Sequence, residues 1–146
     1  MALLSSMTTT KSSDDEAARA LDSAARGDLE ALRALNDLGG AAALSAANAK
    51  GETPAHTAAR EGHDGCLRVL HQFAASTLSV TDATGRTPAH LAAGNGHEGC
   101  LRVLHKLAAS TLSVADADGS TPAHYAAGEG HDGCLRVLHE LAAPTL

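Results

Sequence analysis

Nine histidines and three cysteines are the side chains of this sequence best suited to chemistry, because imidazoles and thiolates bind metal ions and act as bases or nucleophiles. The pair His63 and Cys66 returns at 97 and 100 and again at 131 and 134, with metal-compatible side chains three residues apart on a helix face. Zinc normally needs four converging ligands about 2.0–2.3 Å from the ion. Neighbouring stacked helices lie about 8–10 Å apart, which separates such pairs, so we expect no metal site.

Cys66, Cys100 and Cys134 each fall within a stripe of apolar residues, which favours a role as small core side chains over a nucleophilic one. The Cα atoms of a disulfide lie about 4.4–6.8 Å apart, closer than neighbouring stacked helices, so we expect the thiols to stay reduced in an intracellular compartment. The sequence has no Ser-His-Asp, paired-carboxylate or Gly-rich phosphate-loop arrangement. It therefore predicts no catalytic residue, no cofactor and no enzyme.

A repeat with a constant period organises these side chains. Thr-Pro-Ala-His occurs at 53–56, 87–90 and 121–124, and Gly-His and Gly-Cys-Leu-Arg-Val-Leu-His follow each copy at fixed offsets. A fixed period of this size predicts stacked supersecondary units. We therefore expect an all-α solenoid, which presents an extended surface and seldom a closed catalytic pocket.

Local signals predict two helices in each unit. Proline at the second position of Thr-Pro-Ala-His suits a helix start, and Thr53 is a natural N-cap. The first helix is expected over Pro54–Glu61 and to stop at Gly62. Asp64 can open a second helix that carries one apolar stripe. The polar connection Ser79–Thr84 is expected to turn towards the next unit.

Residues ahead of the first full unit form a weakened copy, because Leu44, Leu78 and Leu112 follow one another at the same period as the Thr-Pro-Ala-His copies. The second helix of this copy is expected over Leu29–Leu38. Ser12, Ser13 and Asp14 are expected to cap the start of its first helix. A polar terminal unit is what a stack needs at its end. The predicted divisions are a disordered tail at 1–13, a degenerate capping unit at 14–50, full units at 51–84 and 85–118, and a shortened unit at 119–146.

These residues resemble the ankyrin repeat family from about residue 14 onward, with Ala55, Ala89 and Ala123 where the family usually has leucine. The resemblance implies a non-catalytic protein-interaction module with a concave face built from hairpin loops and first helices. It also implies that His56, His90 and His124 are structural hydrogen-bond bridges. Two departures concern the second helix. The period exceeds the usual value of about 33, with the extra residue near 76–78, and alanine replaces its terminal glycine, so we expect that helix to run longer.

Differences between the two full units suggest where a partner binds. Six of the nine differing positions match places that the concave face of the resembling family uses for contact. Phe73 and Tyr125 are the expected anchors, since aromatics are over-represented among binding hot spots, and charged positions are expected to set specificity and encounter rate. The predicted contact residues are Glu52, Arg60, Glu61, Phe73, Thr81, Thr84, Arg86, Asn95, Leu107, Asp118, Ser120, Tyr125 and Glu129.

The formal net charge of −6 argues against nucleic acid as a partner, and no apolar run reaches membrane-spanning length. We therefore expect a protein partner and an intracellular, cytoplasmic location, although the acid-free, Ser/Thr-rich tail leaves organelle targeting open. A fixed subunit or spacer of a larger assembly is the alternative function, and a metal or redox sensor is a third. The last helix, expected over 132–143, keeps the apolar set used inside the stack, so self-association or docking through this C-terminal face is also expected.

Overall fold

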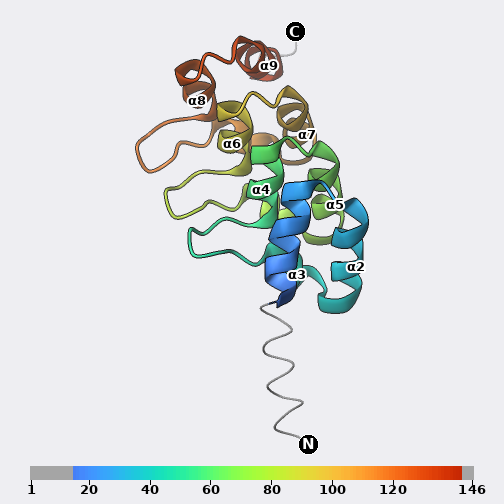
Figure 1. The fold of residues 1–146 in the computed structure, drawn as a ribbon. Helices are drawn as coiled ribbons and strands as arrows, with labels where there is room; N and C mark the ends of the chain where they lie inside the picture. Colours follow the sequence, from blue (N-terminus) through green and yellow to red (C-terminus); the bar gives the residue numbers. More distant parts are fainter. Residues whose placement is uncertain (1–14, 143–146) are drawn as a thin grey trace, which may run out of the picture.

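The computed structural model describes residues 15–142, so the expected tail at 1–13 and the proposed cap at Ser12–Asp14 lie outside the described residues. Within that range the chain forms pairs of helices stacked along one axis, with long loops projecting from one side (Figure 1). No strand occurs among the described residues. The expected all-α solenoid is confirmed.

The first helix includes residues 15–26. The elements that follow it are α2 (Leu29–Gly39), α3 (Ala41–Ser45), α4 (Pro54–Glu61), α5 (Asp64–Ala74), the 3-10 helix η1 (Ala75–Ser79), α6 (Pro88–Gly94), α7 (Glu98–Ala108), the 3-10 helix η2 (Ala109–Ser113), α8 (Pro122–Gly128) and α9 (Asp132–Ala142).

The first helices of the three Thr-Pro-Ala-His units all begin at the proline, and α4 also ends where the local signals predict. In α4, Thr53 is the N-cap, proline occupies the first turn, and Gly62 ends the helix with a φ of 82°. The His56 ring accepts the N–H of Thr53 at 3.1 Å, which pairs one of the donors that a helix start leaves open. Helices α6 and α8 begin in the same way, at Pro88 and Pro122.

The second helices carry the core. In α5, Cys66, Leu67, Val69 and Leu70 are all buried against the neighbouring units. The helix ends at Ala74 rather than running longer, and the extra length takes the form of the 3-10 helix η1. The hydroxyl of Thr77, which is fully buried, donates to the Ala74 carbonyl at 2.8 Å and fixes this change of direction.

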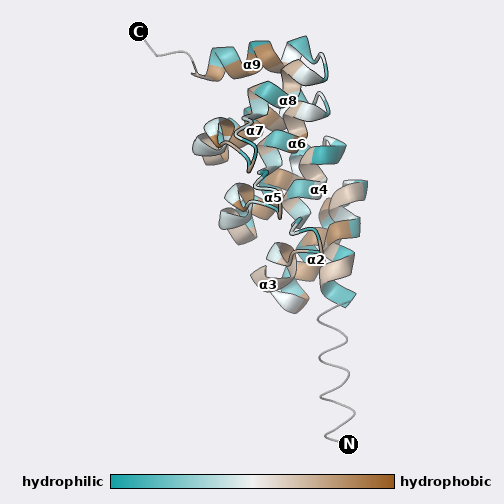
Figure 2. Cartoon of the chain, turned by 90° about the vertical axis from the view of Figure 1, so that its left-hand side faces the viewer, coloured by the Kyte–Doolittle hydropathy of each residue, from teal (hydrophilic) through white to brown (hydrophobic). Residues whose placement is uncertain are grey.

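The helices form two layers. In Figure 1, α4, α6 and α8 lie beside the projecting loops, and α5 and α7 lie on the far side of the stack. Figure 2 looks at the stack from the side of the loops and shows mixed hydrophilic and hydrophobic colouring along it. We call the surface formed by the loops (residues 48–52, 82–86 and 116–120) and α4, α6 and α8 the loop-side face. We call the surface of α2, α5, α7 and α9 the outer layer.

The loops are tied to each other through the main chain. Each closes as a tight turn, in which Gly85 donates to the Asp82 carbonyl at 3.0 Å and Asp82 donates to the Arg86 carbonyl at 2.9 Å. The N–H of Ala83 donates to the carbonyl of Lys50 in the preceding loop at 3.0 Å, and Ala117 donates to Thr84 in the same way. The loops therefore form one continuous surface.

Histidine rings join each unit to both of its neighbours. On the loop side, the Nε2 atoms of His56 and His90 lie 2.8 Å from the carbonyls of Arg86 and Ser120 in the following unit. Since Nδ1 accepts a backbone N–H, Nε2 carries the ring proton and donates. His124 makes the same bonds to Thr121 but is exposed, and its Nε2 has no partner within the described residues. His56 and His90 therefore bond both to their own threonine and to the following unit, as expected of a structural bridge. His124 bonds only to its own threonine.

A second set of rings reaches backward. His97 donates from Nε2 to the Arg60 carbonyl at 2.8 Å, and His63 and His131 make equivalent bonds to Ala25 and Gly94. These bonds join the start of each second helix to the unit before it. Each ring lies against a glycine with positive φ in the turn after the first helix of the preceding unit, where a side chain would collide with it.

We expect Gly62→Ala to lower the thermal midpoint more than Gly130→Ala does. Both glycines have positive φ, 82° and 75°, which costs an alanine about 1–2 kcal/mol. A Cβ at Gly62 would also lie 2.7 Å from Nδ1 of His97, whereas a Cβ at Gly130 would meet nothing within 4 Å. Thermal unfolding followed by circular dichroism measures the difference. Equal midpoints would show that the ring contact contributes nothing to the stack.

Candidate functional site

A groove on the loop-side face brings together four of the predicted contact residues. It has a volume of about 270 Å³ and lies between α6 and α8, beside the loop at 82–86. The predicted residues that line it are Arg86, Asn95, Tyr125 and Glu129. His90, Leu91 and Gly94 complete the wall, so the groove combines a cation, an anion, an amide and an aromatic ring.

Two acidic side chains hold the guanidinium of Arg86. Its Nε donates to Asp82 at 2.8 Å, and its NH2 lies 3.7 Å from Glu52. Burial opposes the ionisation of Asp82, but hydrogen bonds from Arg86 and Thr84 outweigh it and lower the pKa of this carboxyl group. Arg86 therefore enters the groove in a fixed orientation.

Glu52, one of the predicted contact residues, is buried in the structure. Only 4% of it is exposed, because its carboxylate lies beneath two guanidinium groups, 2.5 Å from Arg60 and 3.7 Å from Arg86. The hydrogen bond from Arg60 lowers its pKa. Glu52 therefore organises the arginines that the loop-side face presents, and it does not itself present a carboxylate.

Tyr125 is held in place from two directions. Its hydroxyl donates to Asp116 at 2.5 Å, and its ring meets the His90 ring edge-on with centroids 5.1 Å apart. Burial and the bond to Asp116 raise the pKa of Tyr125 to about 12, and the same bond lowers the pKa of Asp116. An aromatic ring fixed in this way loses little conformational entropy when a partner packs against it.

Sequence reasoning missed how two differences between units compensate for each other. In the loop at 82–86, one oxygen of Asp82 accepts backbone N–H groups and the other accepts Arg86. In the loop at 116–120, Asp116 accepts backbone N–H groups in the same way, but serine stands where the arginine was. Tyr125 then takes the second oxygen. The sequence did hold a signal for this exchange. Ser120 stands where the preceding unit has Arg86, and Tyr125 stands where that unit has Leu91.

The other predicted loop-side residues surround the groove without lining it. Arg60 and Glu61 lie at the end of α4, and Arg60 is bound to Glu52. The exposed members of the predicted set are Glu61, Thr81, Thr84, Asn95, Asp118 and Glu129. Ser120 is half-buried, and its carbonyl accepts His90.

Phe73 and Leu107 are a second correction. They belong to α5 and α7, the helices of the outer layer, and both are partly buried against the apolar core. Phe73 therefore packs against the core from the outer layer, and neither residue joins the loop-side face. Figure 1 shows these two helices on the far side of the stack from the loops.

The three cysteines behave as core side chains. All are buried and free. Burial raises the pKa of Cys66 to about 11 and that of Cys100 to about 12, and it also raises the pKa of Cys134. A thiol that stays protonated is a poor nucleophile and a poor metal ligand. Within residues 15–142, no group of three or more His, Cys, Asp or Glu residues is placed to hold a metal ion.

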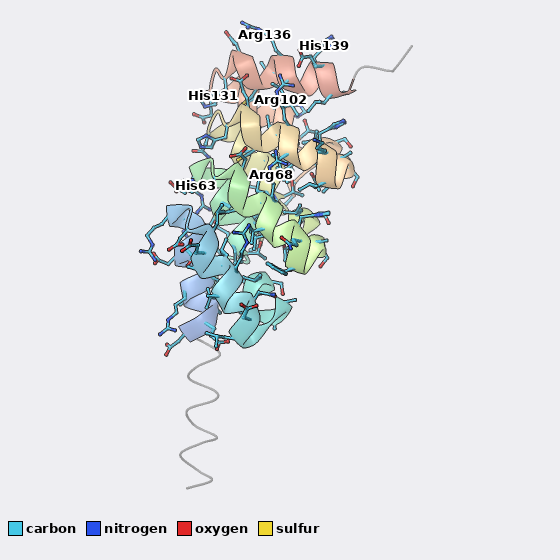
Figure 3. The ribbon with its side chains drawn as sticks, turned by 90° about the vertical axis from the view of Figure 1, so that its right-hand side faces the viewer. His63, Arg68, Arg102, His131, Arg136 and His139 are labelled. Atoms are coloured by element: carbon cyan, nitrogen blue, oxygen red, sulfur yellow. The ribbon has the colours of Figure 1, made fainter. Side chains whose placement is uncertain are left out.

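The outer layer carries a repeated row of basic side chains. Figure 3 shows Arg68, Arg102 and Arg136 one above the other on the second helices. All three are exposed, and Arg102 pairs with Glu140 at 3.1 Å. Exposed pairs of this kind contribute little to stability. This layer therefore offers a repeated, solvated surface, whereas the groove lies where the units differ.

Comparison with known proteins supports the same assignment. A family model described as ankyrin repeats (3 copies) matches residues 18–113 and 72–144. No curated protein matches the chain. Ankyrin repeats generally act as protein-interaction modules and are typically non-catalytic. No helix in the described part of the chain has the length and apolar character needed to cross a membrane. The chain therefore belongs to the ankyrin repeat family.

Proposed function

We propose that this chain binds a protein partner through its loop-side face, with the groove lined by Arg86, Asn95, Tyr125 and Glu129 at the centre. The observation that carries the proposal is the fixed pair of Arg86 and Tyr125 at one groove. Arginine and tyrosine are enriched among binding hot spots, and each is already held by an acidic neighbour. Rigid side chains reduce the entropy that binding must overcome.

The chemistry of the groove favours a partner segment with mixed polarity. Glu129 is exposed and anionic, whereas the charge of Arg86 is shared with Asp82 and Glu52. The matching segment would bring an apolar or aromatic side chain against Tyr125 and Leu91, and a hydrogen-bond donor to Glu129 and Asn95. An intracellular location fits this role, because the three buried thiols are free.

We expect Asn95→Trp to weaken partner binding by at least about 10-fold, since an indole at this position would fill the groove and 1.4 kcal/mol corresponds to a factor of ten. The matched control is Gln72→Trp, the same amide-to-indole change at an exposed position of the outer layer. Alanine variants of Arg86 or Tyr125 are less informative, because both side chains also hold the fold together. Both tryptophan variants should keep thermal midpoints close to that of the parent chain.

The measurement is affinity purification with each chain as bait, followed by mass spectrometry and titration of the captured protein. Loss with Asn95→Trp and retention with Gln72→Trp support the groove. Loss with the control alone would move the binding surface to the outer layer. A complex that stays intact through high salt and does not exchange would instead indicate a fixed subunit of a larger assembly.

A further inference from the structure

The groove between α6 and α8 holds a carboxylate that no cation balances in the part of the chain that the structure describes. Glu129 lines the groove, is exposed at the C-terminal end of α8, and forms no ion pair within residues 15–142. A carboxylate at this end of a helix opposes the helix dipole, so Glu129 does not stabilise α8. Its charge is therefore available to a partner.

Arg86 lines the same groove, but its charge is already balanced. Its Nε donates to Asp82 at 2.8 Å, and its NH2 lies 3.7 Å from Glu52. A carboxylate of a partner that approached Arg86 would therefore meet both of these anions and Glu129 as well. Like charges brought together across an interface disfavour binding. The charges around the groove thus favour a basic partner segment over an acidic one.

The net charge of the loop-side face changes along the stack in the same sense. The loops at 48–52 and 82–86, together with α4, carry three cations and three anions. By contrast, residues 116–129, which include the last loop and α8, contain two aspartates, one glutamate and no lysine or arginine. Figure 1 shows this loop projecting beside α8. Complementary charges steer a partner to such a surface, so this end of the face fits a basic segment.

The groove also offers apolar surface and a second acceptor beside this carboxylate. Tyr125 and Leu91 both line it, and the hydroxyl of Tyr125 donates to Asp116, which adds negative charge next to the ring. A cation close to a tyrosine ring is attracted to it. The Nδ2 of Asn95 donates to the Leu91 carbonyl at 2.8 Å, which leaves its Oδ1 as an acceptor.

The size of the groove restricts what can fill it. Its volume of about 270 Å³ is smaller than the roughly 300–1,000 Å³ of small-molecule sites. Lysine and arginine side chains lay their apolar stems along apolar surface and keep the charged head near water. One such side chain therefore meets both the apolar and the polar parts of the groove.

We propose, on the basis of the proposed function, that this groove takes a lysine or arginine side chain from a basic segment of the protein partner. The cationic head pairs with Glu129 and donates to Oδ1 of Asn95. The apolar stem lies along Tyr125 and Leu91. Other basic residues of the segment face the two aspartates of the loop at 116–120.

A library of random dodecapeptides displayed on phage tests this proposal. The library is selected on the parent chain and then depleted on Asn95→Trp, whose indole should fill the groove. We expect the remaining peptides to share a lysine or arginine at one position. In fluorescence anisotropy, Glu129→Gln should bind such a peptide about 3–10-fold more weakly than the parent chain does. The control Glu30→Gln makes the same change of charge at an exposed position of α2 and should stay within about 1.5-fold, because salt screens distant charges.

Three outcomes would overturn the proposal, and they separate it from the proposed function. Peptides that share an acidic residue would show that Arg86 is the recognised charge, and peptides that share an uncharged one would show that no charge is recognised. Equal losses with Glu129→Gln and Glu30→Gln would show that only net charge matters. In these cases the groove remains the binding site. If no peptide distinguishes the parent chain from Asn95→Trp, the groove binds no such segment, and the proposed function fails with it.

Discussion

Replacing His90 with alanine is expected to lower the free energy of unfolding by roughly 2–5 kcal/mol, or the thermal midpoint by about 5–15 °C. The His90 side chain is fully buried, accepts the N–H of Thr87 at 3.0 Å and donates to the Ser120 carbonyl at 2.8 Å. Alanine leaves both backbone groups without this partner and removes the edge-on contact with Tyr125. The loss therefore weakens two units and the groove between them.

His124 provides the control that the repeat itself supplies. It has the same Thr-Pro-Ala-His context and the same bonds to its own threonine, but it is exposed and its ring has no acceptor in a following unit within the described residues. We expect His124→Ala to cost less than about 1 kcal/mol, as is usual for surface substitutions. Urea unfolding of the two variants measures the difference. Equal losses would mean that the bond to the next unit contributes nothing and that His90 acts only as a helix cap.

Stability is expected to fall in two steps as the pH is lowered. Burial lowers the pKa of His56 and His90 in the folded chain, so the unfolded chain takes up these protons first, near its pKa of about 6.5. Lowering the pH through that value therefore favours unfolding. Glu52, Asp82 and Asp116 have lowered pKa values when folded. Their stabilising contribution is present above about pH 4 and is lost as the pH falls further.

Thermal unfolding between pH 8 and pH 3 tests this expectation. The midpoint should be nearly constant above pH 7, fall by several degrees between pH 6.5 and 5, and fall again below about pH 4.5. In Asp82→Asn the lower step should shrink and the upper step should remain. A midpoint that stays constant from pH 7 to 5 would show that the buried rings are not linked to unfolding.

The helices were predictable because their signals are local. Thr53 and Pro54 fix where α4 begins, and Gly62 fixes where it ends, without help from the rest of the chain. The 3-10 helix η1 was harder to predict. The backbone conformation after Ala74 depends on the hydrogen bond of Thr77 and on how η1 packs against other elements. The repeat period shows that each unit has one extra residue, but it does not determine the backbone conformation after Ala74.

The groove was only partly predictable. Comparing units identifies positions that differ, and this drew attention to Arg86 and Tyr125, but difference does not reveal exposure. Glu52 differs between units but is buried in ion pairs with Arg60 and Arg86, and Phe73 differs but packs partly buried against the core. The backward bonds from the second set of histidines were also missed, since a backbone carbonyl such as that of Arg60 leaves no mark in a sequence.

The two directions of the histidine bonds have a consequence for the order in which the chain is made. His97 reaches back 37 residues to a carbonyl that has already been synthesised, whereas His90 waits for one that comes 30 residues later. At about 5–20 residues per second on the ribosome, that wait is roughly 2–6 s. A newly synthesised unit can therefore dock onto the preceding unit at once. Its forward histidine bond forms only after the following unit has been synthesised. The order of synthesis, from the N-terminus to the C-terminus, is therefore also the order in which the units can dock.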